Sequence, residues 1–128
     1  MKELTRTECA DWLLERDRFV LLSHRKPDGD TLGSCAALCR GLRQLGKTAY
    51  VLENPELPPR YAFLLEGLTR ECAAETDTVV AVDVAAANML PKAFADFAAD
   101  KDANYHYNLV VQLIIVNFTI GILISVAV

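Results

Sequence analysis

The sequence predicts an incomplete α/β fold, a three-layer sandwich on a mainly parallel sheet, followed by an apolar C-terminal tail. Residues 19–23, 48–53 and 78–84 form short apolar runs with the length of buried strands, and stretches with helical spacing lie between them. Strands that alternate with helices favour a parallel sheet. The composition then changes near Ala103, since every charged residue precedes it and every Ile follows it.

Residues 5–16 are expected to form an amphipathic helix before the first strand. Thr5 and Glu8 have the spacing of a capping box, in which each side chain accepts a hydrogen bond from the other residue's backbone N–H. The apolar residues expected on one face of this helix are Ala10, Leu13 and Leu14. Trp12 lies beside that face and is expected in the core.

A second helix is expected over residues 31–45, with Thr31 as its N-cap and Gly46 at its end. Its expected inner stripe consists of Leu32, Cys35, Cys39 and Leu42. Small residues in its first turns would let the helix N-terminus approach a metal ion or a phosphate closely. Shorter helices are expected over residues 61–68 and 89–99.

Polar side chains follow the first strand, in the segment SHRKPDGDTLGS at residues 23–34. His24, Asp28 and Asp30 would lie at the carboxyl end of this strand, where open α/β sheets bind their ligands. A ligand set rich in oxygen with one histidine suits Mg²⁺ or Mn²⁺ better than zinc. The alternative is a solvated Asp-Gly turn beside a surface histidine.

Asp83 stands near the end of the third predicted strand, after a run of apolar residues. A carboxylate in such a strand is costly unless it is paired or coordinated. Because parallel strands align their carboxyl ends, Asp83 would lie at the same sheet edge as His24. The alternatives are a helix N-cap or a strand end that faces the surface.

Charge and cysteine content narrow the class of protein. The net charge of −4 excludes a broad basic surface for duplex nucleic acid, but divalent cations could still admit a phosphorylated substrate. Arg25 and Lys26 could steer a phosphate at the rim of the loop, or they could be two solvated cations. The four cysteines form no Cys-x-x-Cys pair, and the charged N-terminus is no signal segment, which predicts a cytoplasmic protein with free thiols.

One run of residues resembles the first motif of the DHH phosphoesterases: His24-x-x-Pro27-Asp28-x-Asp30-Thr31-x-Gly33-Ser34. The likeness is closest to the branch of oligoribonucleases and 3′-phosphoadenosine-5′-phosphate phosphatases, and it covers roughly residues 5–100. It implies a Mn²⁺-dependent enzyme that hydrolyses phosphoesters in short oligonucleotides or nucleotides.

The resemblance also implies a role for each site residue. Asp83 matches the family's second motif, a single Asp that ends a strand and bridges two metal ions. The family pattern would place His24 and Asp28 on one Mn²⁺ ion and Asp30 on the other, about 3.5–4 Å apart, with Mg²⁺ as a substitute. A water shared by the ions would attack phosphorus in line, so these four residues are the expected catalytic residues.

The sequence departs from the family after Asp100. The Asp-His-His triplet that names the family is absent, as are a further metal-binding Asp and a C-terminal substrate domain. His106 lies at a suitable distance past Asp83 to serve as a metal ligand, but it lacks the neighbouring Asp and His. We therefore expect a truncated form with weak or no activity. The alternative is a non-catalytic metal-binding module or a membrane-tethered interaction module.

We expect residues 1–103 to be a partial phosphoesterase domain and residues 104–128 to be a separate apolar tail. Residues 109–128 carry no charge, and as a helix they would span about 30 Å, one bilayer core. Such a helix would anchor the protein to a membrane. The Val and Ile content also fits an aggregation-prone pair of strands. The change of composition favours a third account, a segment unrelated to the enzyme that was joined by truncation or a shift of reading frame.

Overall fold

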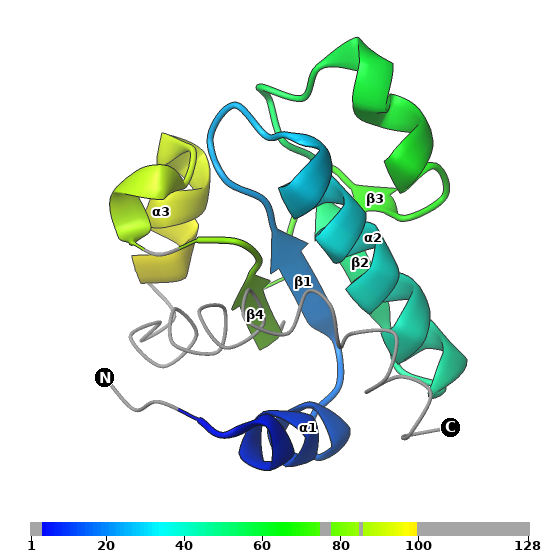
Figure 1. The fold of residues 1–128 in the computed structure, drawn as a ribbon. Coiled ribbons are helices and arrows are strands. Elements are labelled where there is room, and N and C mark those ends of the chain that lie inside the picture. The colour runs from blue at the N-terminus through cyan, green and yellow to red at the C-terminus, as the bar shows by residue number, and fades with distance from the viewer. Residues whose placement is uncertain (1–3, 75–77, 85, 100–128) are drawn as a thin grey trace.

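The computed structural model describes residues 4–74, 78–84 and 86–99, and it has the expected α/β architecture (Figure 1). The elements in chain order are α1 (Arg6–Leu14), β1 (Phe19–Leu22), α2 (Gly29–Gln44), β2 (Ala49–Leu52), the 3₁₀ helix η1 (Pro59–Leu65), β3 (Thr69–Arg70), β4 (Thr78–Ala81), the 3₁₀ helix η2 (Ala87–Met89) and α3 (Lys92–Ala99). The three predicted strands are confirmed as β1, β2 and β4. The two residues of β3 are too few to show a strand pattern in the sequence.

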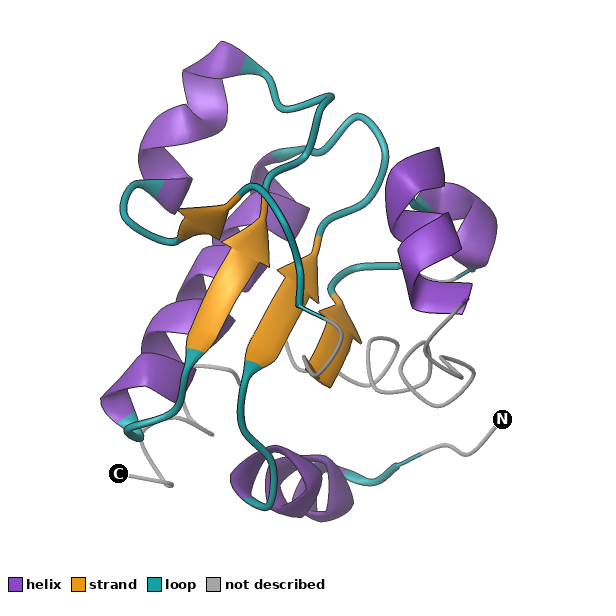
Figure 2. Cartoon of the chain, turned by 180° about the vertical axis from the view of Figure 1, so that it is seen from behind, coloured by secondary structure: helices purple, strands orange, loops and turns teal. Residues whose placement is uncertain are grey.

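The sheet is parallel throughout, with the four strands in the order β3-β2-β1-β4. Seen from behind in Figure 2, the strands run in one direction and α2 lies on their far face. The central strand β1 pairs Phe19 with Thr78 and Leu22 with Ala81, so β1 and β4 end at the same level. The loops that follow these two strands therefore leave the sheet next to each other.

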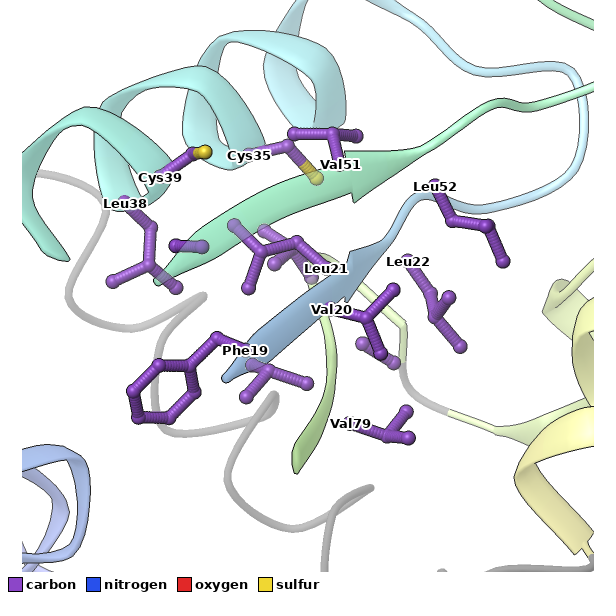
Figure 3. Packing of buried hydrophobic residues seen from close by; sticks show 14 of the residues in the cluster. Phe19, Val20, Leu21, Leu22, Cys35, Leu38, Cys39, Val51, Leu52 and Val79 are labelled. Carbon is purple, nitrogen blue, oxygen red and sulfur yellow. The ribbon is translucent and has the colours of Figure 1, made fainter. Parts of the chain in front are cut away.

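Apolar side chains of the central strands and of α2 form the core. All residues of β1 are buried, and Cys35 and Leu38 of α2 point toward the strands in Figure 3. The inner stripe predicted for this helix is buried in full. Cys9 is also buried, which raises the pKa of its thiol to about 11 and leaves it protonated at neutral pH.

The capping box predicted for α1 is present, but its buried face differs from the prediction. Thr5 Oγ1 accepts a hydrogen bond from the Glu8 N–H at 3.2 Å, and Glu8 Oε2 accepts one from the Thr5 N–H at 2.8 Å. Cys9 and Trp12 are buried, whereas Leu14 is 47% exposed. The buried face is thus rotated from the predicted one, because Trp12 packs its ring against Phe19 at the start of β1.

The N-cap of α2 is Asp28, so the prediction of Thr31 as the cap is wrong. Asp28 Oδ1 accepts hydrogen bonds from the N–H groups of Asp30 and Thr31, at 3.1 and 3.0 Å. Both residue types cap helices well, and the helix begins at the earlier of the two. Gly46 follows the helix with a φ of +80°, a conformation that glycine adopts without steric cost.

Within the described part of the chain, no helix has the length and apolar character needed to cross a membrane. The apolar segment 109–128 lies outside the described residues, and so does His106.

Candidate metal centre

The loops after β1 and β4 bring three of the predicted ligands together. One ligand atom each from His24, Asp28 and Asp83 can be chosen so that all three lie within 4.8 Å of one another. His24 Nε2 is 3.6 Å from Asp28 Oδ1 and 3.8 Å from Asp83 Oδ2. These distances are too long for hydrogen bonds, so the three groups face one another without direct bonds.

The orientation of the His24 ring is set by the backbone of its own loop. Its Nδ1 atom lies 2.7 Å from the carbonyl oxygen of Arg25. Since a carbonyl oxygen only accepts, Nδ1 must carry the hydrogen, and a neutral ring then presents the lone pair of Nε2 to the two carboxylates. A lone pair beside two carboxylates is repulsive unless a proton or a metal ion lies between them. A backbone carbonyl on the other ring nitrogen is also the usual support of a metal-binding histidine.

Asp28 combines a structural role with its position in the site. Its Oδ1 atom accepts the two backbone hydrogen bonds that begin α2, and the same atom is the one nearest His24 Nε2. The partial positive charge at the helix N-terminus stabilises the negative charge of this carboxylate. The side chain is exposed, which leaves its second oxygen accessible to an ion.

Asp83 lies in the bend that follows β4, since the strand ends earlier than predicted. The strand stops at Ala81, and Asp83 has a φ of +60°, in the left-handed region that Asp adopts more readily than most residues. Its side chain is only 20% exposed. Burial raises the pKa of Asp83, the negative charges of Asp30 and Asp28 raise it further, and His24 opposes them. The carboxylates therefore repel one another, and a cation among them would relieve the repulsion.

The remaining predicted site residues lie around this group. Asp30 is exposed in the first turn of α2 and is not part of the group of three, although it is near enough to raise the pKa of Asp83. Arg25 and Lys26 are exposed and line an open hollow that His24 also borders.

A buried amide that was not singled out from the sequence supports the position of His24. Asn54 Nδ2 donates to Ser23 Oγ at 2.8 Å and to the carbonyl oxygen of His24 at 2.9 Å. The bond to Ser23 is buried and the bond to His24 is partly buried, so the first is shielded from water. Asn54 directly follows the predicted strand 48–53, as His24 follows the predicted strand 19–23, and that shared placement was the signal in the sequence.

The hydroxyl of Thr31 joins the two halves of the site. It is fully buried and donates to the carbonyl oxygen of Val82 at 2.9 Å, which links the first turn of α2 to the turn that carries Asp83.

Thr31→Val is expected to lower the free energy of unfolding by about 1–3 kcal/mol, because the buried Val82 carbonyl would lose its partner. Urea denaturation followed by circular dichroism measures this loss. Thr31→Ser keeps the hydroxyl and should retain most of the stability. Equal losses in both variants would mean that the methyl group, and not the hydrogen bond, matters at this position.

One imidazole nitrogen and two carboxylates are a suitable donor set for Mn²⁺ or Mg²⁺, and their mutual repulsion is of the kind that a divalent cation removes. No protein-family model matches this chain, and no characterised protein matches its sequence significantly. Functional inference therefore depends on the chemistry of the site itself.

Proposed function

We propose that this chain is the N-terminal part of a DHH-type phosphoesterase, a metal-dependent hydrolase of short oligonucleotides or nucleotide 3′-phosphates, in a weakly active or inactive form. The observation that supports the proposal is the approach of His24, Asp28 and Asp83 at the carboxyl edge of a parallel sheet. These residues come from two loops separated by more than half of the described chain, and they match the first two motifs of that family.

In this proposal, His24, Asp28 and Asp83 would hold one Mn²⁺ ion, and Asp30 and Asp83 would contribute to a second. Metal ions in such a site polarise the phosphoryl oxygens and lower the pKa of bound water. Mg²⁺ has the same preference for oxygen ligands and could replace Mn²⁺.

The protein's own groups prepare this site in three ways. The hydrogen bond from His24 Nδ1 to the Arg25 carbonyl keeps Nε2 directed at the carboxylates. Asn54 holds the backbone of His24, and Thr31 holds the backbone next to Asp83. Ligand atoms supported in this way need little reorganisation when they bind an ion, which is the usual basis of affinity and of catalysis in metal sites.

A second function, metal binding without turnover, is favoured by one observation. The sequence has no Asp-His-His triplet, which supplies a ligand to the second ion in the resembled family. Without that ligand the second ion would be held less well, so less positive charge would face the phosphoryl oxygens where negative charge develops. Such stabilisation is often worth several kcal/mol of the activation barrier.

The test combines metal binding and substrate hydrolysis on the full chain. Electron paramagnetic resonance measures free Mn²⁺. Chromatography follows the formation of adenosine 5′-monophosphate, two molecules from each 5′-phosphorylated diadenylate, or one molecule and inorganic phosphate from each adenosine 3′,5′-bisphosphate. We expect Mn²⁺ binding with product formation that is very slow or no faster than in Asp83→Asn. Slow product formation above that background supports a phosphoesterase, and binding without it supports the non-catalytic module. Absence of Mn²⁺ binding would reject the metal centre, and fast turnover would contradict the expected weak activity.

A further inference from the structure

An open hollow of about 390 Å³ adjoins the candidate metal centre. It is lined by His24, Arg25, Lys26, Asn88 and Met89, so it lies between the loop after β1 and the helix η2. His24 belongs to both places, with its Nε2 atom directed at Asp28 and Asp83. A ligand that occupied both the metal centre and this hollow would therefore contact His24 in both places.

The two walls of the hollow are joined by a backbone hydrogen bond. The N–H of Arg25 donates to the carbonyl oxygen of Met89 at 2.6 Å. The next residues also restrict the loop, since Lys26 has a φ of +46° and Pro27 is buried. The backbone that presents the two cations is therefore held in place against η2, and a ligand would not have to order it.

The lining has the chemistry of a site for an anion with an attached ring system. Two side chains are cationic, and none of the described residues that line the hollow is acidic. Asn88 offers an amide that can both donate and accept hydrogen bonds, and the partly exposed side chain of Met89 offers an apolar surface.

A second hollow, on the opposite flank of the site, is lined by acidic residues. In both overall views the loop after β1 rises between η1 on one side and α3 on the other (Figures 1 and 2). On the η1 side, a hollow of about 440 Å³ is lined by Glu53, Glu66 and the exposed ring of Phe63, among others. Two carboxylates would repel a phosphate there, so an anionic ligand at the metal centre is directed to the η2 side.

We propose that the hollow between Arg25 and Met89 is the subsite for a nucleoside monophosphate unit of the substrate. Arg25 and Lys26 bind its phosphate, and Asn88 and Met89 contact the nucleoside. This assignment rests on the proposed function for the chemistry at the metal centre, but the hollow itself is defined by residues that are not metal ligands, apart from His24. A substrate bound in this hollow would lie along η2 and away from η1.

The test is nuclear magnetic resonance of the full ¹⁵N-labelled chain, titrated with adenosine 5′-monophosphate and with adenosine, both without metal and with Mg²⁺. We expect the amide signals of residues 24–26 and 88–89 to shift, and to shift more with the nucleotide than with the nucleoside. Shifts centred on Glu53 and Glu66, or no shifts up to millimolar nucleotide, would overturn the assignment.

Matched charge variants complete the test. The double variant Arg25→Gln with Lys26→Gln should weaken nucleotide binding by about tenfold or more, because it removes two charged contacts to phosphate. Arg40→Gln removes an exposed cation near the other end of α2 and should change nothing. Both positions of the double variant are exposed, and its spectrum reports whether the fold is retained.

The two proposals can fail separately. If the nucleotide shifts the hollow's signals while the chain binds no Mn²⁺, the subsite is supported and the metal centre is rejected. If Mn²⁺ binds but the double variant binds the nucleotide as tightly as the unmodified chain, the subsite is rejected and the metal centre remains.

Discussion

Asp83→Asn is expected to lower the affinity of this chain for Mn²⁺ by at least about 100-fold. Replacing a residue that only supports a metal ligand usually lowers metal affinity by about 10- to 100-fold. Asp83 is itself one of the three groups that converge, so the loss should be larger. The substitution keeps the size of the side chain and suits the left-handed backbone at this position, since Asn adopts that conformation readily. Calorimetric titration with Mn²⁺ at neutral pH measures the change.

Asp11→Asn is the matched control, because Asp11 is an exposed carboxylate on α1, at the end of the sheet away from the site. It should bind Mn²⁺ as tightly as the unmodified chain. Equal and weak binding in all three proteins would reject the metal centre.

The raised pKa of Asp83 makes a related prediction about pH. A carboxyl group with a folded-state pKa above its unfolded value stabilises the fold at low pH, and this contribution is lost as the pH rises through the folded value. At neutral pH without metal, Asp83→Asn should therefore be at least as stable as the unmodified chain, and any advantage should shrink as the pH falls. Mn²⁺ affinity should fall on acidification at a higher pH than an ordinary carboxylate would require. Thermal unfolding and metal titrations between roughly pH 4 and 8 test both statements.

Phe19→Ala is expected to lower the free energy of unfolding by about 3–5 kcal/mol, the usual cost of removing a buried aromatic ring. Phe19 is 0% exposed and begins the central strand, where its ring contacts Trp12 with centroids 6.4 Å apart. Because a domain of this size is stable by only about 5–15 kcal/mol, much of the total would be lost. Urea denaturation followed by far-ultraviolet circular dichroism gives the value.

Phe63→Ala is the same chemical change at a position that is 68% exposed, and it should alter stability by no more than about 0.5 kcal/mol. A loss of similar size in both variants would mean that the packing around β1 does not control the stability of the fold.

Much of the architecture follows from local patterns in the sequence. Three apolar runs with helical stretches between them predicted a parallel sheet, and the sheet is parallel. Because parallel strands align their carboxyl ends, the predicted sheet also placed His24 and Asp83 at one edge. The register of β1 and β4 agrees with this, since the two strands end at the same level. The capping box of Thr5 and Glu8 was predictable too, since both of its hydrogen bonds join residues three positions apart.

Tertiary structure decided how each polar group of the site is used. Asp28 and Thr31 are both residue types that cap helices, but the Thr31 hydroxyl bonds Val82, 51 positions away in the sequence, and Asp28 is the cap. Asn54 and Ser23 likewise meet only in the folded chain, at a separation of 31 positions.

The His24 ring is held by a local contact with the carbonyl oxygen of Arg25, whereas the segment that carries Asp83 is joined to α2 by the distant Thr31. Residue types specify which strands and helices form, because the periodic spacing of apolar residues is a property of the local sequence. The partner of a buried donor or acceptor depends on which groups the completed core excludes from water, since each excluded group must find a partner within reach. The local pattern therefore determined where the site lies, and the packed core determined the long-range hydrogen bonds of Thr31 and Asn54 that hold it together.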